Sequence, residues 1–587
     1  MKPIAAETLV TRLVDWGVDT VFGLPGDGIN GLFEAFRRHA DRIRLVIVQH
    51  EEAAAFMACA HAKMTGRLGV CLATSGPGGV HLLNGLYDAK LDNVPVLALT
   101  GMQETSLLGT GYQQEVHLEK LYTDVAEYDA MITNPQHVQA LVDAAVRTSL
   151  ARRTVSHLTF PNDIQVAPAE LDPYEHVAPA RVPRTGATFF PVSGRPDADA
   201  LQQLALHLER GTKTAILAGA GALGAGPELL QVAELLGAPI VKTLPGKAAV
   251  PDDSPYTTGG LGLLGTGPSE RLMAEVDTLL MVGTNFPYTK HLPEPDQVTA
   301  VQIEADPTRA GARLPLAAAV VGDAKTCLSE LVPLLTRRED RSFLEQYQAE
   351  MRSWRDDMAA LQDPTRHPIA PEYLMSVIDD AAADDAVLTC DSGTIATWAA
   401  RHWTIRGGRE FYLSGNLATM APGLPYANAA KVLYPDRQVI AFVGDGGFAM
   451  LMAELRTAAL HGLHTKVFIN NNGAFGQILW EQIALGFPEY ETRHATTPDF
   501  APWAQACGAY AATVDDPADL PAAVEAALAH PGPAVVDCRV NADEPPLPGK
   551  IEKKQAIGFM KAFTSGQPHK RAIVKTLVED TASKLRP

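Results

Sequence analysis

Short apolar runs alternate with amphipathic stretches along almost the whole chain. Apolar runs bounded by turn residues are typical of strands that are buried on both faces of a sheet. The helical stretches between them predict parallel strands joined by crossover helices, as in doubly wound α/β sheets. The pattern predicts strands at residues 20–22, 45–48, 69–73, 94–100, 215–218, 239–242, 278–282, 298–303, 386–389, 439–443, 466–469 and 534–540.

The predicted strands fall into three groups, which we interpret as three α/β domains, each a doubly wound parallel sheet. A proline-rich stretch at residues 166–195 follows the first group, and a polar helical connector at residues 337–371 follows the second. A length of 587 residues suits three or four domains. The expected boundaries are 1–185 for the N-terminal domain, 186–340 for the central domain, 341–545 for the C-terminal domain and 546–587 for a tail.

The composition is that of a soluble protein that does not bind nucleic acid. Acidic residues number 68 against 49 basic ones, and the net charge of −19 repels nucleic acid. No apolar run approaches the roughly 20 residues of a membrane span, and Glu7, Asp15 and Asp19 argue against a signal or transit peptide. The cysteines show no CxxC spacing, so we expect reduced core residues in a cytoplasmic protein.

A glycine-rich turn and an asparagine run follow two consecutive predicted strands of the third group. The first strand opens onto Gly444-Asp445-Gly446-Gly447, and the second ends at Asn470-Asn471-Asn472. Magnesium prefers oxygen ligands and shares them with phosphate groups, so Asp445 and Asn472 would suit it at one sheet edge. A helix expected at residues 449–461 would direct its N-terminus to the phosphate. An ordinary βαβ turn followed by an asparagine-rich loop is the alternative.

A second candidate centre follows the strand predicted at residues 45–48. The chain continues as Gln49-His50-Glu51-Glu52 and then as a helix of small apolar residues from Ala53 to Met64. Glu51 places a carboxylate at the end of this strand. The helix dipole alone would favour an acidic residue in this first turn, without any further role.

In combination these segments resemble the thiamine diphosphate-dependent enzymes, and the resemblance to the pyruvate oxidase and pyruvate:quinone oxidoreductase family, in the acetolactate synthase superfamily, covers nearly the whole chain. It implies thiamine diphosphate and Mg²⁺ as cofactors, with Asp445, Asn472 and the backbone carbonyl of Ala474 as metal ligands. It also implies that Glu51 hydrogen-bonds the pyrimidine ring and activates the cofactor, and that Met420 bends it. Further implied cofactor contacts are Gly76, Ser392, Gly393, Ala418, Thr419, Gly444, Gly446 and Gly447.

The segment from Ser75 to Leu86 separates the branches of this family. Its Gly-x-His-Leu-x-Asn-Gly-Leu pattern resembles pyruvate oxidases, whereas acetolactate synthases lack the histidine, so His81 is expected in the active site. By the same resemblance Gln114 would bind the substrate carboxylate, and Glu481 stands where synthases place a tryptophan. Two positions that are aromatic in relatives are polar in this chain and leave the substrate and the electron acceptor open: Gln113 and Gln477.

The central domain contains a GxGxxG pattern from Gly219 to Gly224, which alone would suggest a dinucleotide site. The next predicted strand ends in Lys242-Thr243 and lacks the acidic residue that holds a nicotinamide-cofactor ribose, so an NAD-dependent dehydrogenase is disfavoured. The resemblance implies FAD instead, in a flavin-type Rossmann-like domain. The residues it assigns to FAD are Gly219, Gly221, Gly260, Leu261, Gly283, Thr284, Asn285, Phe286 and Ile303.

The activity implied by the resemblance is oxidative decarboxylation of pyruvate, or of a close 2-keto acid, to acetate and carbon dioxide with electrons passed to a quinone. One alternative is an oxygen- and phosphate-dependent pyruvate oxidase that makes acetyl phosphate. A second is a carboligase like acetolactate synthase, and a third is a catalytically silent lipid-binding or regulatory homologue.

Two further expectations concern partners of the chain. The resemblance implies a homo-oligomer, at least a dimer and usually a tetramer, because the domains of Glu51 and Asp445 meet across subunits in this family. The tail from Ala556 to Leu585 has an amphipathic helical pattern. It would either contact a membrane peripherally, as in the pyruvate:quinone enzymes, or dock on its own protein. The apolar face is predicted to contain Ile573, Val574, Leu577, Val578 and Leu585.

Overall fold

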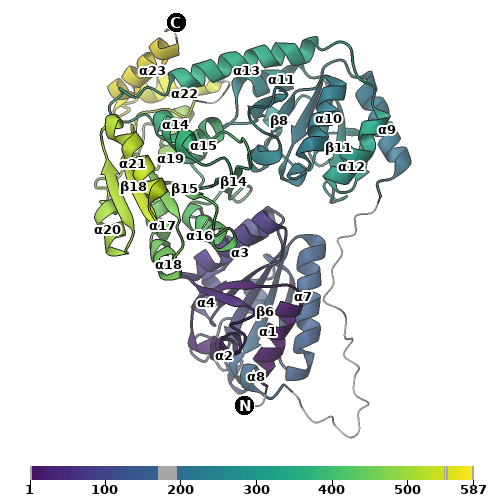
Figure 1. The fold of residues 1–587 in the computed structure, drawn as a ribbon, viewed down its shortest axis with the longest axis vertical. Helices are drawn as coiled ribbons and strands as arrows, with labels where there is room; N and C mark the ends of the chain where they lie inside the picture. Colours follow the sequence, from purple (N-terminus) through teal and green to yellow (C-terminus); the bar gives the residue numbers. More distant parts are fainter. Residues whose placement is uncertain (1–2, 170–194, 548, 550–552, 585–587) are drawn as a thin grey trace.

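The computed structural model describes residues 3–169, 195–547, 549 and 553–584. Within these residues the chain forms three six-stranded sheets, and all pairings between their strands are parallel (Figure 1). The three parallel-sheet α/β domains expected from the sequence are therefore confirmed. The proline-rich stretch predicted to separate the first two domains lies mostly outside the described residues.

The first sheet has the order β2, β1, β3, β4, β6, β5. Its strands are β1 (Thr20–Gly23), β2 (Arg44–Ile47), β3 (Gly69–Ala73), β4 (Val96–Met102), β5 (Ala126–Met131) and β6 (Val155–Pro161). Its helices are α1 (Ala5–Asp15), α2 (Asn30–Arg38), α3 (Glu51–Thr65), α4 (Pro77–His81), α5 (Leu83–Leu91), α6 (Leu118–Leu121), α7 (Val138–Arg152) and α8 (Asn162–Val166).

The central sheet has the order β12, β11, β10, β7, β8, β9. Its strands are β7 (Thr214–Ala218), β8 (Ile240–Lys242), β9 (Thr257–Gly260), β10 (Thr278–Val282), β11 (Thr299–Glu304) and β12 (Leu316–Val321). The accompanying helices are α9 (Ala198–Arg210), α10 (Gly226–Leu236), α11 (Gly267–Glu275) and α12 (Ala324–Leu331), followed by the connecting helix α13 (Ser342–Ala360).

The third sheet has the order β14, β13, β15, β16, β18, β17, which repeats the order of the first. Its strands are β13 (Val387–Cys390), β14 (Glu410–Leu413), β15 (Val439–Gly444), β16 (Lys466–Asn471), β17 (Tyr510–Val514) and β18 (Ala534–Arg539). Its helices are α14 (Pro371–Ala381), α15 (Thr394–His402), α16 (Gly423–Leu433), α17 (Asp445–Leu451), α18 (Glu454–His461), α19 (Gly476–Leu485), α20 (Phe500–Ala506) and α21 (Leu520–Ala529).

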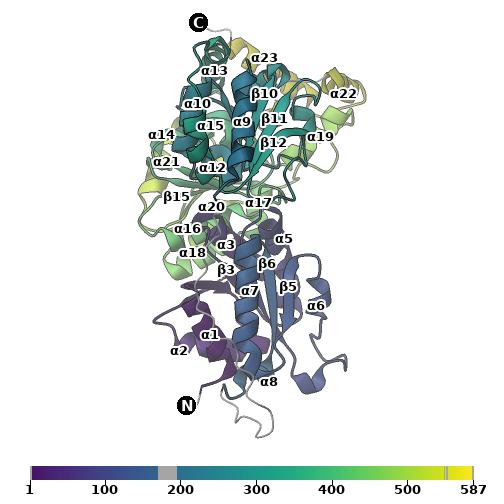
Figure 2. The same cartoon turned by 90° about the vertical axis from the view of Figure 1, so that its right-hand side faces the viewer.

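Helix α3 joins the first domain to the third. It packs on β3 and α5 of its own domain and on α16 of the third domain, so nearly every residue from Glu51 to Ala62 is buried (Figures 1 and 2). Small residues make this packing close: a Cβ added to Gly69 would lie 2.0 Å from the carbonyl oxygen of Ala58. The helix that begins with Glu51 is therefore fixed against both domains.

The predicted helix at residues 449–461 is wrong at its start and is broken in the middle. Helix α17 begins at Asp445 itself, and α18 begins at Glu454. Gly446 and Gly447, which have low helix propensity, occupy the first turn of α17 because side chains there would collide with neighbours. A Cβ on Gly447 would lie 2.1 Å from Oδ2 of Asp391.

Six strands escape the sequence prediction. Five of them, β5, β9, β12, β14 and β17, are edge strands or carry mixed polar residues. The sixth, β6, is fully buried, but Ser156, His157 and Thr159 interrupt its apolar run. These polar side chains are satisfied within the core, since Ser156 bonds to Ser149 at 2.8 Å and His157 to Thr100 at 2.7 Å.

The tail consists of two helices, α22 (Lys553–Thr564) and α23 (Lys570–Lys584), and α22 packs on α19. The single apolar face predicted for the tail is wrong: Ile573 is buried and Leu577 packs with it, whereas Val574 and Val578 are exposed. Leu585 lies outside the described residues. Among the helices that the structure describes, none has both the length and the apolar character needed to cross a membrane.

Candidate active site

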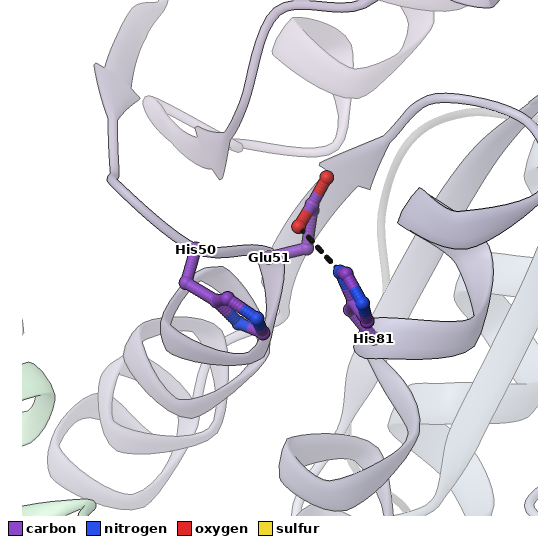
Figure 3. Close-up of side chains that lie close together, drawn as sticks. All are labelled: His50, Glu51 and His81. Carbon is purple, nitrogen blue, oxygen red and sulfur yellow. Dashed lines mark hydrogen bonds and ion pairs between the residues drawn. The ribbon is translucent and has the colours of Figure 1, made fainter. Parts of the chain in front are cut away.

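Glu51 is the first residue of α3, directly after the loop that follows β2. His50 caps the helix, since its Nδ1 accepts the backbone N–H of Glu52 at 3.1 Å. The Glu51 side chain is 10% exposed, and its Oε2 lies 3.0 Å from Nδ1 of His81 (Figure 3). The rings of His50 and His81 stack with centroids 4.5 Å apart. The structure thus brings together Glu51 and His81, two of the catalytic residues predicted from sequence.

The ligand atoms of His50, Glu51 and His81 lie within 4.8 Å of one another, a spacing compatible with a metal ion. The hydrogen bonds argue against one. Because Nδ1 of neutral His50 accepts the Glu52 N–H, its proton is on Nε2, and no lone pair remains free for a metal without loss of the cap. We therefore interpret the cluster as a hydrogen-bonded acid and base.

Gln114 lies beside the turn that leads to His81. Its Oε1 is 3.4 Å from Oγ of Ser75, and a Cβ on Gly76 would lie 2.8 Å from the Gln114 carbonyl oxygen. Gly76 itself has φ of 60°, which favours glycine. A Cβ on Gly78 would lie 3.4 Å from Oε1 of Glu51, so this turn also borders the carboxylate.

Asp391 and Asp445 follow the neighbouring strands β13 and β15 directly, at the point where the strand order of the third sheet reverses. Ligands of doubly wound sheets bind at this point. Both side chains are buried, and among the described residues neither Oδ2 has a hydrogen-bond partner. Burial raises the pKa of each carboxyl group to about 7. Nε2 of His494 lies 3.6 Å from Oδ2 of Asp445.

The asparagine run lies at the carboxyl end of β16, next to the end of β15. Asn470 is buried and its Oδ1 has no partner among the described residues, while Oδ1 of Asn472 accepts the N–H of Ala474 at 3.1 Å. Oxygen atoms left without donors in a buried site are costly unless a ligand satisfies them. The donor set of carboxylates and amides fits a magnesium ion bound with a diphosphate.

Glycines leave room beside these oxygens. No described atom lies within 4 Å of a Cβ added to Gly444 or to Gly393, whose φ is 119°. A Cβ on Gly446 would instead meet the ring of Phe475 at 2.8 Å and Cε of Met420 at 3.4 Å. The predicted wedge Met420 therefore lies close to the Asp445 turn. Ser392 and Gly393 follow β13 directly and precede α15.

Several side-chain contacts join the first and third domains, and two of them lie close to the start of α3. Nδ2 of Asn84 lies 3.2 Å from Oγ1 of Thr419 and 2.6 Å from Oε1 of Glu52. Oε1 of Glu454 accepts the N–H groups of Gln49 and His50, both at 3.0 Å, at the start of α3. The Glu51 region and the loop of Thr419 and Met420 are thus connected within one chain.

Glu481 lies apart from these contacts on an exposed part of α19. Its Oε1 accepts Nε2 of Gln477 at 2.9 Å. Trp480 is buried and stacks on Phe559 of the tail, with ring centroids 6.3 Å apart. The two glutamines that stand where relatives have aromatic residues lie in different surroundings. Gln113 is exposed, and Gln477 is hydrogen-bonded to Glu481.

Two groups of the predicted flavin residues, around Gly219 and Gly283, lie where the central sheet reverses, between β7 and β10. The N–H of Gly221 bonds to the carbonyl of Gly283 at 2.9 Å, and a Cβ on Gly219 would lie 2.4 Å from the same oxygen. The two loops pack so closely that only glycine fits at these positions. They lie at the edge where ligands of doubly wound sheets bind. The remaining assigned residues follow β9, β10 and β11 or lie in them: Gly260, Leu261, Thr284, Asn285, Phe286 and Ile303.

Lys242 at the end of β8 has a structural role in the central domain. Its Nζ bonds to the carbonyl of Val250 at 3.0 Å and to Asp252 at 2.5 Å, and Lys247 shares the same carboxylate. Burial lowers the pKa of Lys242 to about 8. Asp252 thus neutralises two buried lysines at this end of the sheet.

Several site residues were not predicted from the sequence as functional side chains: Asp391, Asn84, Glu454, Asn470 and His494. Asp391 follows a predicted strand directly, and this strand-end position is a usable signal. Glu454 and Asn84 lie within helical stretches, where polar residues ordinarily face solvent. Only the docking of the two domains shows that they face a neighbour.

Comparisons with known proteins agree with this geometry. Three thiamine pyrophosphate enzyme models match: the N-terminal TPP binding domain over residues 4–121, the central domain over 201–331 and the C-terminal TPP binding domain over 391–538. A putative thiamine pyrophosphate-containing protein of Bacillus subtilis is 39% identical over 557 residues, which cover 95% of each chain.

Two further relatives represent different activities. Pyruvate oxidase of Lactiplantibacillus plantarum is 32% identical over 92% of this chain and 89% of that enzyme. A probable acetolactate synthase large subunit of Methanococcus aeolicus is 29% identical over 91% of this chain and 92% of its own. The sequence identity to the two relatives is similar, so a distinction between their activities has to rest on individual residues.

Glu454 gives a test of the contact between the domains. Burial raises its pKa from 4.5 to about 7, so its contribution to stability is complete below the unfolded value and is lost as the pH rises through about 7. Glu454→Gln keeps the acceptor but cannot ionise. We expect the unfolding free energy of the variant, relative to wild type, to rise by up to about 3 kcal/mol between about pH 5 and about pH 8.

Urea unfolding of both proteins at the two pH values measures this difference. Glu525→Gln, at an exposed position of the same domain, is the control and should show no such change. A difference between wild type and Glu454→Gln that is constant with pH would show that Glu454 is not buried in this way.

Proposed function

The chain belongs to the thiamine pyrophosphate enzyme family, and from this premise we propose that it decarboxylates pyruvate, or a close 2-keto acid, oxidatively to acetate. Water supplies the second oxygen of acetate, carbon dioxide leaves, and two electrons and two protons reduce a quinone to a quinol. The contact between His81 and Glu51 carries the proposal. Acetolactate synthases, by the resemblance above, lack this histidine.

Bound thiamine diphosphate supplies a nucleophilic carbon and takes up the electron pair released with carbon dioxide, and bound flavin accepts two electrons. Glu51 would hold a hydrogen bond to the pyrimidine ring at its buried carboxyl group. His81 restrains that carboxyl group through Nδ1, and its partly exposed ring would be accessible to substrate. Gln114, which contacts Ser75 in the same turn, would bind the substrate carboxylate.

Mg²⁺ would be held by Asp445, Asn472 and the carbonyl of Ala474, since unpaired buried oxygens gather at this edge. Gly444 would leave room for the diphosphate, and Gly446 and Gly447 would let the first turn of α17 pack closely beside it. For FAD, the interlocked loops of Gly219 and Gly283 provide the phosphate-binding edge of the central domain. We further propose a homo-oligomer, a dimer or tetramer, in which the N-terminal and C-terminal domains of different copies also meet.

A quinone is favoured as acceptor by an apolar surface on α19 and α22. Helix α22 also contains three lysines, although the chain as a whole is acidic: Lys553, Lys554 and Lys561. Basic residues beside exposed apolar ones suit peripheral contact with an anionic membrane, where quinones dissolve. We therefore propose a cytoplasmic protein that reaches the inner face of the membrane through this surface. Its exposed apolar residues are Ile478, Leu485, Phe487, Tyr490, Ile557 and Met560.

The carboligase remains the second candidate, because acetolactate synthases are among the relatives. Purified protein with pyruvate, thiamine diphosphate, Mg²⁺ and FAD separates the two. We expect acetate and carbon dioxide, with reduction of a quinone analogue exceeding oxygen uptake and increasing when anionic vesicles are added. Acetolactate as the main product without any acceptor would contradict the proposal, and acetyl phosphate with oxygen uptake would replace the quinone by oxygen.

Glu51→Gln keeps the size of the side chain and removes its acidic proton. Since general acid and base groups contribute about 10²- to 10⁴-fold, we expect turnover to fall at least about 100-fold while the protein stays folded. Initial rates of acceptor reduction at saturating cofactor measure the effect. Glu104→Gln, an exposed change in the same domain, should leave the rate unaltered. Turnover of Glu51→Gln equal to wild type would reject the assignment.

A further inference from the structure

The loop between β14 and α16, residues 414–422, has a strained backbone. Ala418 and Ala421 adopt φ of 55° and 80°, in the left-handed region that alanine rarely occupies. Such residues persist only where the surrounding structure imposes them. This is the loop of Thr419 and Met420, so whatever imposes its conformation also sets the position of the predicted pyrimidine contacts.

Asp92 of the N-terminal domain holds the beginning of this loop. Its Oδ2 accepts the N–H of Gly415 at 2.8 Å, and its Oδ1 accepts both the N–H and Nδ2 of Asn416, each at 2.8 Å. A Cβ on Gly415 would lie 2.9 Å from each carboxylate oxygen. One carboxylate therefore caps two successive backbone N–H groups of the other domain, at a position where only glycine allows the approach.

Lys63 holds Asp92 in place. Its Nζ lies 2.6 Å from Oδ2 of Asp92 and 3.2 Å from Oδ1 of Asp88, and it also donates to Tyr426 and to the carbonyl of Leu413. Burial acts to raise the pKa of Asp92, but Lys63 and the two capped N–H groups lower it below its ordinary value. The carboxylate is therefore ionised at neutral pH, the form that accepts these bonds best.

Lys63 belongs to α3, the helix that begins with Glu51. One end of α3 thus presents the candidate catalytic carboxylate, and the other end fixes the carboxylate that caps the loop. The far side of the loop is held by a different group, since Oδ1 of Asp391 accepts the N–H of Gly423 at 2.7 Å. The two anchors come from different domains.

We propose that Asp92, held by Lys63, is a positioning residue that sets the loop of Ala418 to Met420 for the pyrimidine end of thiamine diphosphate. The proposal rests on the cofactor assignment of the proposed function. Asp92 touches the loop and not the edge of Asp445 and Asn470, so it affects the pyrimidine end of the cofactor and leaves the diphosphate end alone. Docking of the N-terminal domain and binding of the cofactor are thereby coupled.

The test uses the full-length protein freed of cofactor, with Mg²⁺ present, and isothermal titration with two probes. Asp92→Asn cannot accept both N–H groups, so we expect the dissociation constant for thiamine diphosphate to rise about tenfold or more. The dissociation constant for inorganic pyrophosphate, which engages only the diphosphate end, should stay within about twofold of wild type. Asp41→Asn, an exposed change in the same domain, should alter neither constant.

Equal weakening of both probes would show a general structural role and overturn the proposal, as would unchanged thiamine diphosphate binding. If Asp92→Asn does not fold, Asn416→Ala removes one bond to Asp92 from an exposed side chain and should show a smaller loss with the same selectivity; no selective loss in that variant overturns the proposal. Failure of the wild type to bind thiamine diphosphate would instead contradict the cofactor assignment itself.

Discussion

The structure depends on how its buried carboxyl groups are satisfied. Glu51 and Glu454 are buried near the boundary between the first and third domains, and Asp391 and Asp445 are buried at strand ends of the third sheet. Desolvation raises the pKa of Asp391, Asp445 and Glu454 to about 7. Buried acids without full partners destabilise a fold, and they persist where a ligand or a neighbouring domain satisfies them. Glu454 is satisfied by the start of α3, whereas Asp391 and Asp445 each retain an oxygen for a ligand.

Much of the fold and part of the site follow from the sequence. Strands buried on both faces, such as β3 and β10, have continuous apolar runs and were predicted with their exact bounds. Five of the six edge strands escape the prediction because their residues are mixed, whereas the edge strand β2 is predicted. The sequence points to Glu51 and Asp445 because strand ends, glycines and the family resemblance mark these positions. The sequence does not indicate a role for Asp92 or Glu454. Their hydrogen-bond partners are more than 300 residues away in sequence, and only the docked domains show these contacts.

The same distinction applies to the activity. The Asp445 edge fits decarboxylase, ligase and oxidase alike, and the family matches do not separate them. In the proposed function the separation rests on His81, which contacts Glu51, and on Glu481, which Gln477 holds on α19. In this proposal a few residues around a shared centre determine which reaction follows decarboxylation. One fold can support several reactions in this way.

The central claim, that electrons from the 2-keto acid leave through flavin, is tested most directly by mixing the fully loaded protein with pyruvate in the absence of oxygen and of any other acceptor. The account predicts that the visible absorbance of the flavin bleaches in a single turnover, with one acetate and one carbon dioxide formed per flavin. A flavin that stays oxidised while acetolactate accumulates would contradict it.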